Sequence, residues 1–79
     1  MIAPDELVAH IRAAMPDAEI EVVDRTGMSD HFRVSVTSGA FVGVKALDRQ
    51  RLVYAALREP MEDGRIHALE IRAIPRTEG

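Results

Sequence analysis

Two histidines stand where an imidazole could bind a metal. The first, His67, lies in the segment "GRIHALEI", residues 64–71, which is predicted to be a strand entered from a tight turn. Because strand side chains alternate between two faces, His67 would point the same way as Leu69 and Ile71. Neutral imidazole is the commonest metal ligand in proteins. His67 is therefore either a metal ligand or a half-buried histidine that is held by a backbone carbonyl.

The other histidines carry weaker indications. His31 opens the alternating segment "HFRVSVTS" on the face opposite Phe32 and Val34, so it is expected at the edge of a loop. His10 is out of register with the apolar residues of its predicted helix and is expected on the surface. Two histidines without a cysteine or a matched carboxylate do not make a closed metal site. A metal at His67 would then need ligands from another molecule.

Catalytic motifs are weak in this sequence. Ser29, Asp30 and His31 are adjacent, whereas a nucleophilic triad is assembled in space around a base and a group that orients it. The segment "GAFVG" has neither the GxGxxG nor the Walker spacing of a phosphate loop. The sequence contains no cysteine, which excludes disulfides and any zinc or iron–sulfur site built from its own thiolates. Nothing in the sequence resembles an active site.

Length and charge restrict the class of protein further. The 79 residues are expected to form one domain, residues 1–79, and the net charge of −3 argues against nucleic-acid binding as a global property. Nucleic acid could still bind to a local basic patch formed by Arg49, Arg51 and Arg58 on a predicted helix. Such a charge cluster is usually only a solvated surface. No apolar run approaches the about 20 residues of a membrane span. The start, "MIAPDELVAH", lacks the basic region of a secretory signal, so a cytoplasmic location without a membrane is expected.

Hydrophobic periodicity predicts the elements that would position these side chains. It predicts two helices, over 4–15 and 46–58, and three strands, over 18–24, 31–38 and 65–74. The order αββαβ favours an α+β fold in which helices cover one face of a three-stranded sheet. Strands two and three are expected to run antiparallel. The expected core comprises Phe32, Val34, Val36, Leu52, Val53, Leu57, Leu69 and Ile71.

From residue 31 onward the sequence resembles the BolA family in four segments. "HFRVSVTS" is similar to its histidine-phenylalanine strand, "FVG" to its F-x-G turn, "DRQRLVYAAL" to its R-H-R-x-V-x-x-x-L helix and "IHAL" to its hallmark strand. Each segment alone is a weak signal, but the four occur in the right order and at the right spacing. Two departures are Gln50, in place of the second basic residue of the helix, and Ile74, in place of the threonine before Pro75. The loop before His31 also lacks the cysteine or histidine that several members carry.

The resemblance implies a fold similar to a class II KH domain and a non-enzymatic role. BolA-like proteins form hetero-dimers with monothiol glutaredoxins and share a bridging [2Fe–2S] cluster in iron–sulfur trafficking and iron sensing. The family's cluster ligand is the histidine of the "IHAL" strand, which corresponds to His67. His31 is the weaker candidate for a second ligand. The cluster would be present only with glutaredoxin and its glutathione, so the isolated chain should carry no cofactor. The resemblance is compatible with either a monomer or a homodimer for the apo form.

A second function is kept as an alternative. KH-like folds include nucleic-acid-binding regulators, and some BolA-like proteins act in transcription. A KH domain clamps nucleic acid with a GXXG loop between helices. "GAFVG" has one residue too many and follows a strand, so Arg49, Arg51 and Arg58 would have to carry this role.

Overall fold

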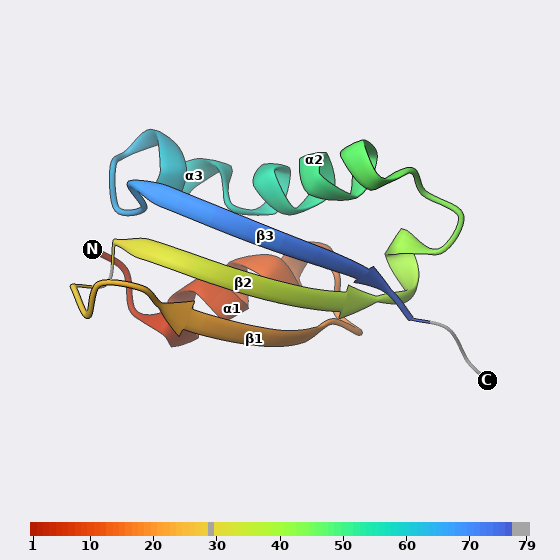
Figure 1. Ribbon diagram of the computed structural model, residues 1–79, viewed down its shortest axis with the longest axis horizontal. Helices are drawn as coiled ribbons and strands as arrows, with labels where there is room; N and C mark the ends of the chain where they lie inside the picture. Colours follow the sequence, from red (N-terminus) through yellow and green to blue (C-terminus); the bar gives the residue numbers. More distant parts are fainter. Residues whose placement is uncertain (29, 77–79) are drawn as a thin grey trace.

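A sheet of three strands carries its helices on one face (Figure 1). The computed structural model describes residues 1–28 and 30–76. The elements follow in the order α1 (Pro4–Ala14), β1 (Glu19–Asp24), β2 (His31–Ser38), the short 3₁₀ turn η1 (Gly39–Phe41), α2 (Ala46–Ala56), α3 (Arg58–Glu62) and β3 (Ala68–Pro75). The predicted α+β class and the αββαβ order are confirmed, with α3 as an additional helical turn. None of the helices in these residues has the length and apolarity that crossing a membrane requires.

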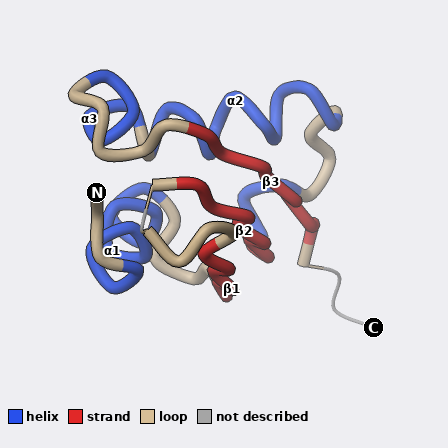
Figure 2. The backbone as a smooth tube through the Cα atoms, turned by 60° about the vertical axis from the view of Figure 1, so that its left-hand side comes forward, coloured by secondary structure: helices blue, strands red, loops and turns tan. Residues whose placement is uncertain are grey.

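The order of strands in the sheet is β1-β2-β3. The pair β1 and β2 is antiparallel, whereas β2 and β3 are parallel, so the antiparallel prediction for β2 and β3 is wrong. The physical reason is the long connection through η1, α2 and α3, which carries the chain back along the sheet to the end where β2 began (Figure 2). A crossover of this kind permits parallel pairing, whereas a tight hairpin would impose antiparallel pairing.

Helix α1 is delimited by two prolines. Pro4 occupies the start of the helix, where its missing N–H has no helical partner to lose, and Asp5 and Glu6 follow in the first turn. The helix ends at Ala14, one residue earlier than predicted, because Pro16 disfavours the helical conformation of Met15. The stripe of Leu7, Ile11 and Met15 is buried.

The second predicted helix is divided in two. Leu57 has φ −105° and ψ 15°, and it separates α2 from α3. Pro60 lies in the first turn of α3 and is buried. Proline is tolerated there because the early N–H groups of a helix have no partner within it.

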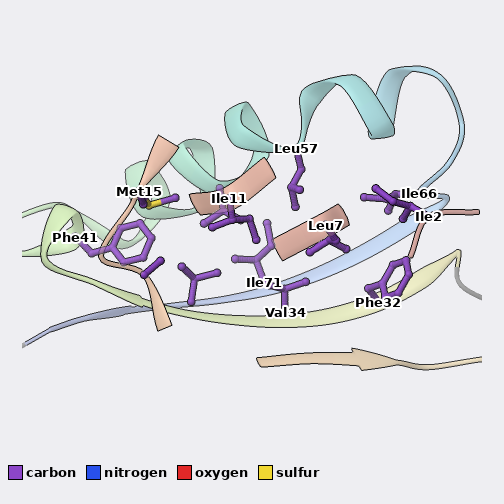
Figure 3. Packing of buried hydrophobic residues seen from close by; sticks show 13 residues of the cluster. Ile2, Leu7, Ile11, Met15, Phe32, Val34, Phe41, Leu57, Ile66 and Ile71 are labelled. Carbon is purple, nitrogen blue, oxygen red and sulfur yellow. The ribbon is translucent and has the colours of Figure 1, made fainter. Parts of the chain in front are cut away.

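The core lies between the helices and the inner face of the sheet (Figure 3). Phe32, Val34, Val36, Val53, Leu57 and Ile71 are buried as predicted, and they are joined by Phe41 and Ile66. Leu69 is only partly buried. Leu52 was assigned to the core wrongly, because it is 42% exposed. One step along a helix turns the side chain by about 100°, so Leu52 cannot share the inward direction of Val53 and Leu57, which are four residues apart.

The outer edge of β3 is covered by side chains of α2. The amide nitrogen Nε2 of Gln50 donates a hydrogen bond of 3.0 Å to the carbonyl of Ile71. The hydroxyl of Tyr54 reaches the carbonyl of Leu69 over 3.5 Å. These contacts satisfy groups of an edge strand that would otherwise be open to pairing with another chain. They also give Gln50, the departure from the family's basic pattern, a structural role.

Replacing Gln50 with glutamate should destabilise the fold by about 1–3 kcal/mol, since a donor is lost and a carboxylate faces the carbonyl of Ile71. Urea unfolding followed by circular dichroism measures this difference. Tyr54→Phe is the control, because its long and exposed contact should contribute little. A Gln50→Glu protein as stable as the wild type would show that the amide contact contributes nothing to the fold.

Asp17 fastens the C-terminal end of β2 to the turn that follows α1. Its carboxylate accepts hydrogen bonds of 2.8 Å from the N–H of Gly39 and of 2.7 Å from the hydroxyl of Ser38, which is fully buried. The N–H of Gly39, the Ser38 hydroxyl and the nearby Arg76 favour the charged form, and together they lower the pKa of Asp17 from its usual 3.8.

This lowered pKa gives the protein a defined acid sensitivity. The unfolded chain binds the proton more tightly than the native state, so the stabilisation by Asp17 is complete above pH 3.8 and is lost as the pH falls through the native pKa. Thermal unfolding from pH 7 to pH 3 should therefore show a smaller loss of Tm in Asp17→Asn than in the wild type. Ser38→Ala, which removes one of the donors, should give an intermediate slope. Equal slopes in the three proteins would contradict this assignment.

Candidate functional site

The first residues of β2 and the residues just before β3 lie side by side because these strands are parallel (Figure 2). His31 is the register partner of Ala68, so His67 precedes the partner of His31 by one position. Their ring centroids are 6.2 Å apart, and the ring planes are inclined by 68°. His31, the weaker candidate ligand, therefore lies near His67, and the parallel pairing of β2 and β3 produces this placement.

His67 itself lies outside the strand in which it was predicted. The strand β3 begins at Ala68, and the side chain of His67 is 61% exposed. It therefore does not lie in the apolar stripe of Leu69 and Ile71. Its N–H donates to the carbonyl of Asp30 over 2.8 Å, and the N–H of Ala68 is 3.3 Å from the same oxygen. This pair of contacts fixes the backbone of His67 at the point where the chain enters the sheet.

The turn before His67 is also well held. Gly64 has a φ of +83°, a conformation that glycine adopts without strain. The carboxylate of Asp63 accepts from the N–H of Arg65 over 3.0 Å and from its Nε over 2.8 Å, and the first of these contacts is the largest cause of a lowered pKa at Asp63. Ile66 is buried, and its N–H donates to the carbonyl of Pro60 over 3.0 Å. An exposed imidazole is thus presented from a firmly anchored turn.

Asp30 is the residue of the site that the sequence analysis missed. Its side chain is 21% exposed, and Oδ2 lies 3.4 Å from Nδ1 of His67 and 4.0 Å from Nε2 of His31. In the sequence, Asp30 stands out only as a neighbour of Ser29 and His31 in a possible catalytic triad. Asp30 directly precedes His31 in the sequence, which could have indicated a role at the site. Recognising that role also requires the register of β2 and β3, because this register brings His67 to the same place. Ser29, the remaining member of that triad, lies outside the described residues.

The three side chains form a set of potential metal donors. One ligand atom each from Asp30, His31 and His67 lies within 4.8 Å of the others. His10 is not part of this group within the described residues; it is half-buried on α1. A hollow of about 390 Å³ adjoins the set, lined by Arg25, Thr26, His31, Phe32, Ala68, Leu69 and Glu70. The set offers imidazole nitrogen and carboxylate oxygen, and it leaves space beside it for groups of another molecule.

The chain matches the model of a known protein family. The sequence model described as "BolA-like protein" matches residues 9–78. The chain belongs to the BolA family. Its IHAL segment, and with it His67, lies inside the matched region.

Individual members of the BolA family agree with this assignment over most of their length. Protein BOLA2 of Arabidopsis thaliana is 36% identical over 73 residues, which cover 91% of this chain and 76% of the relative. The DNA-binding transcriptional regulator BolA of Escherichia coli is 31% identical over 78 residues, covering 90% of this chain and 73% of the relative. The structure of BolA1 from Arabidopsis thaliana is 28% identical, with a TM-score of 0.82, and the match covers 95% of this chain and 93% of that one.

Two of the three arginines considered for nucleic-acid binding have partners within this BolA family protein. Arg49 donates through Nε to the carbonyl of Val44 over 2.7 Å, so it holds the loop before α2. Arg51 is paired with Asp48 over 3.3 Å. Arg51 and Arg58 border one shallow hollow of about 350 Å³, together with Tyr54, Ala55, Met61 and Glu62. Acidic side chains therefore accompany the basic ones, which weakens the positive field at this surface.

Proposed function

We propose that this BolA family protein is a non-enzymatic adaptor that binds a monothiol glutaredoxin and completes the coordination of a shared [2Fe–2S] cluster through His67. The role would lie in iron–sulfur trafficking or in iron and redox regulation, within the cytoplasm. The observation that carries the proposal is an exposed histidine on an anchored turn, beside a second histidine, in a chain without cysteine.

The donors of the chain fit a shared cluster better than a cluster of its own. A [2Fe–2S] cluster takes four protein ligands, which are usually thiolates, and histidine replaces some of them in Rieske centres. This sequence provides no thiolate, so the remaining ligands would come from the cysteine of glutaredoxin and from its glutathione. A neutral imidazole in place of a thiolate raises the reduction potential of such a cluster. The part of this chain would be to present the imidazole and to set its surroundings.

His31 is proposed as the second and weaker ligand. Its ring stands 6.2 Å from that of His67, and its side chain is 43% exposed. His31 is the first residue of β2, and the strand fixes its backbone. It therefore has less freedom to approach a partner than a residue of the preceding loop would have.

Co-expression with a monothiol glutaredoxin from the same cell tests this proposal. The co-purified hetero-dimer should show the visible absorption of a [2Fe–2S] cluster and contain two irons per pair. The chain purified alone should be colourless and hold no stoichiometric iron or zinc. Failure of the two proteins to co-purify, or a firmly bound metal in the isolated chain, would overturn the shared cluster.

A nucleic-acid-binding regulator is the second candidate. The printed name of the Escherichia coli relative, which describes that protein as DNA-binding, is the observation that favours it. The net charge of −3 and the acidic neighbours of Arg51 and Arg58 oppose it. Gel shifts at increasing salt distinguish the candidates, because phosphate contacts weaken steeply with salt. Absence of binding at micromolar protein would remove this function.

A further inference from the structure

We infer that Asp30 is a positioning residue for His67: its carboxylate holds the imidazole as the Nδ1–H tautomer and so directs Nε2 outward as the free ligand atom. The inference rests on the proposed function, because it concerns how the proposed ligand is prepared for a metal. Asp30 has no role in the resemblance on which that function was based.

The first observation is that Asp30 contacts His67 through both backbone and side chain. The carbonyl of Asp30 accepts the N–H of His67 over 2.8 Å, which fixes the position of the Cα atom of the histidine. Oδ2 of the same residue stands 3.4 Å from Nδ1. This separation is slightly longer than an ordinary hydrogen bond, so forming one requires the exposed ring to turn toward Oδ2. Two separate contacts therefore hold His67 relative to Asp30.

The second observation is that the two carboxylate oxygens of Asp30 have separate partners. The hydroxyl of Thr26 donates to Oδ1 over 3.0 Å. The N–H of Met28 donates to that hydroxyl over 3.2 Å, so the single hydroxyl proton of Thr26 is available for Asp30. The loop between β1 and β2 thus occupies Oδ1 and leaves Oδ2 facing the histidines.

The chemistry of the carboxylate decides the tautomer. An ionised carboxylate only accepts hydrogen bonds, and a neutral imidazole carries its proton on one nitrogen alone. A carboxylate facing Nδ1 therefore favours the proton there and leaves the lone pair on Nε2, at the other edge of the ring. Metal-bound histidines are commonly oriented in this way by a carboxylate on the second nitrogen. His31 presents Nε2 to the same oxygen from 4.0 Å, beyond hydrogen-bond range, so it is held less firmly.

Nuclear magnetic resonance of the isolated chain tests the tautomer without any partner. Ring nitrogen shifts should be recorded at a pH of about 8, where ordinary histidines are neutral. In the wild type, His67 should be mainly the Nδ1–H form. Asp30→Asn should move it toward the tautomer mixture of an unstructured histidine. Thr26→Val, which removes the donor to Oδ1, should produce a smaller change and serves as a second variant if Asp30→Asn does not fold.

The control is Asp48→Asn, an exposed carboxylate of α2 whose ion pair with Arg51 is remote from the site. It should leave the shifts of His67 unchanged. If the tautomer of His67 is the same in the wild type and in both site variants, the inference is wrong, whatever the cluster does.

Cluster lifetime in the glutaredoxin complex is the second readout. Asp30→Asn retains His67, yet the lifetime should fall about 10- to 100-fold, as is usual when the group that orients a ligand is lost. Asp48→Asn should not change it. A changed tautomer with an unchanged lifetime would overturn the positioning role. A wild-type complex that forms no cluster would overturn the proposed function instead, and the tautomer result would then describe the isolated protein alone.

A direct metal ligand is the competing role for Asp30. Titration of the isolated chain with Zn²⁺ distinguishes it, because two imidazoles and a carboxylate could bind this ion without a partner. We expect no stoichiometric binding. Binding of one Zn²⁺ that is lost in Asp30→Asn would identify Asp30 as a ligand and would replace the positioning role.

Discussion

Replacing His67 with alanine should abolish the cluster that is shared with glutaredoxin, or shorten its lifetime by more than about 100-fold. Loss of a group that only orients a ligand costs up to about 100-fold, and loss of the ligand itself should cost more. The fold should survive, because the side chain is 61% exposed and the backbone N–H that binds Asp30 is kept. Exposed substitutions of this kind usually change stability by less than about 0.5 kcal/mol. Visible absorption, circular dichroism of the cluster and thermal unfolding of the isolated variant measure both expectations.

The other histidines supply graded controls. His31→Ala should reduce the cluster lifetime in part, and His10→Ala should leave it unchanged, since His10 lies on α1 and outside the donor group among the described residues. If His67→Ala keeps the spectrum and lifetime of the wild type, His67 is not the ligand. It would then be a histidine at a strand entrance that is kept for its contact with Asp30.

Leu57→Ala should destabilise the protein by about 2–5 kcal/mol, the usual range for a buried leucine. Leu57 is fully buried where α2 gives way to α3, and its truncation leaves a cavity above the sheet. Small domains have total stabilities of about 5–15 kcal/mol, so the variant should be partly unfolded at moderate temperature. Urea unfolding gives the difference in free energy, and Val34→Ala, in the centre of β2, should lose about 2–4 kcal/mol in the same assay.

Leu52→Ala is the matched control for this truncation. The residue type is the same and it lies five positions earlier on α2, but it is 42% exposed. Its loss should be well below that of Leu57→Ala. Equal losses would show that the division of this helix into buried and exposed leucines is incorrect.

Local patterns in the sequence were sufficient to predict most elements of the fold. The alternation in "HFRVSVTS" predicted both the bounds and the inward face of β2, and the periodicity of residues 4–15 predicted the limits of α1 to within one residue. The error at Leu52 arose because neighbouring apolar residues on a short helix do not by themselves define which direction is inward. That direction depends on how α2 lies against β3, which is a non-local property.

The site was predicted less completely, for the same reason. His67 and His31 were found by residue type, but their contact depends on the register between β2 and β3. Antiparallel pairing of these two strands had been assumed, without weighing that the long helical connection between them permits parallel pairing. Asp30 was overlooked because a carboxylate acquires a role only beside the group that it orients, and that group is far away in the sequence.

The parallel pairing of β2 and β3 also sets when the histidines can meet during folding. The hairpin of β1 and β2 joins neighbouring segments and can form early, whereas β3 must wait until the long crossover has closed. A nascent or partly unfolded chain therefore displays single, separated imidazoles. The two histidines come together only once β3 has docked, so the proposed cluster ligands would be in place for a partner only when the folding of this chain is complete.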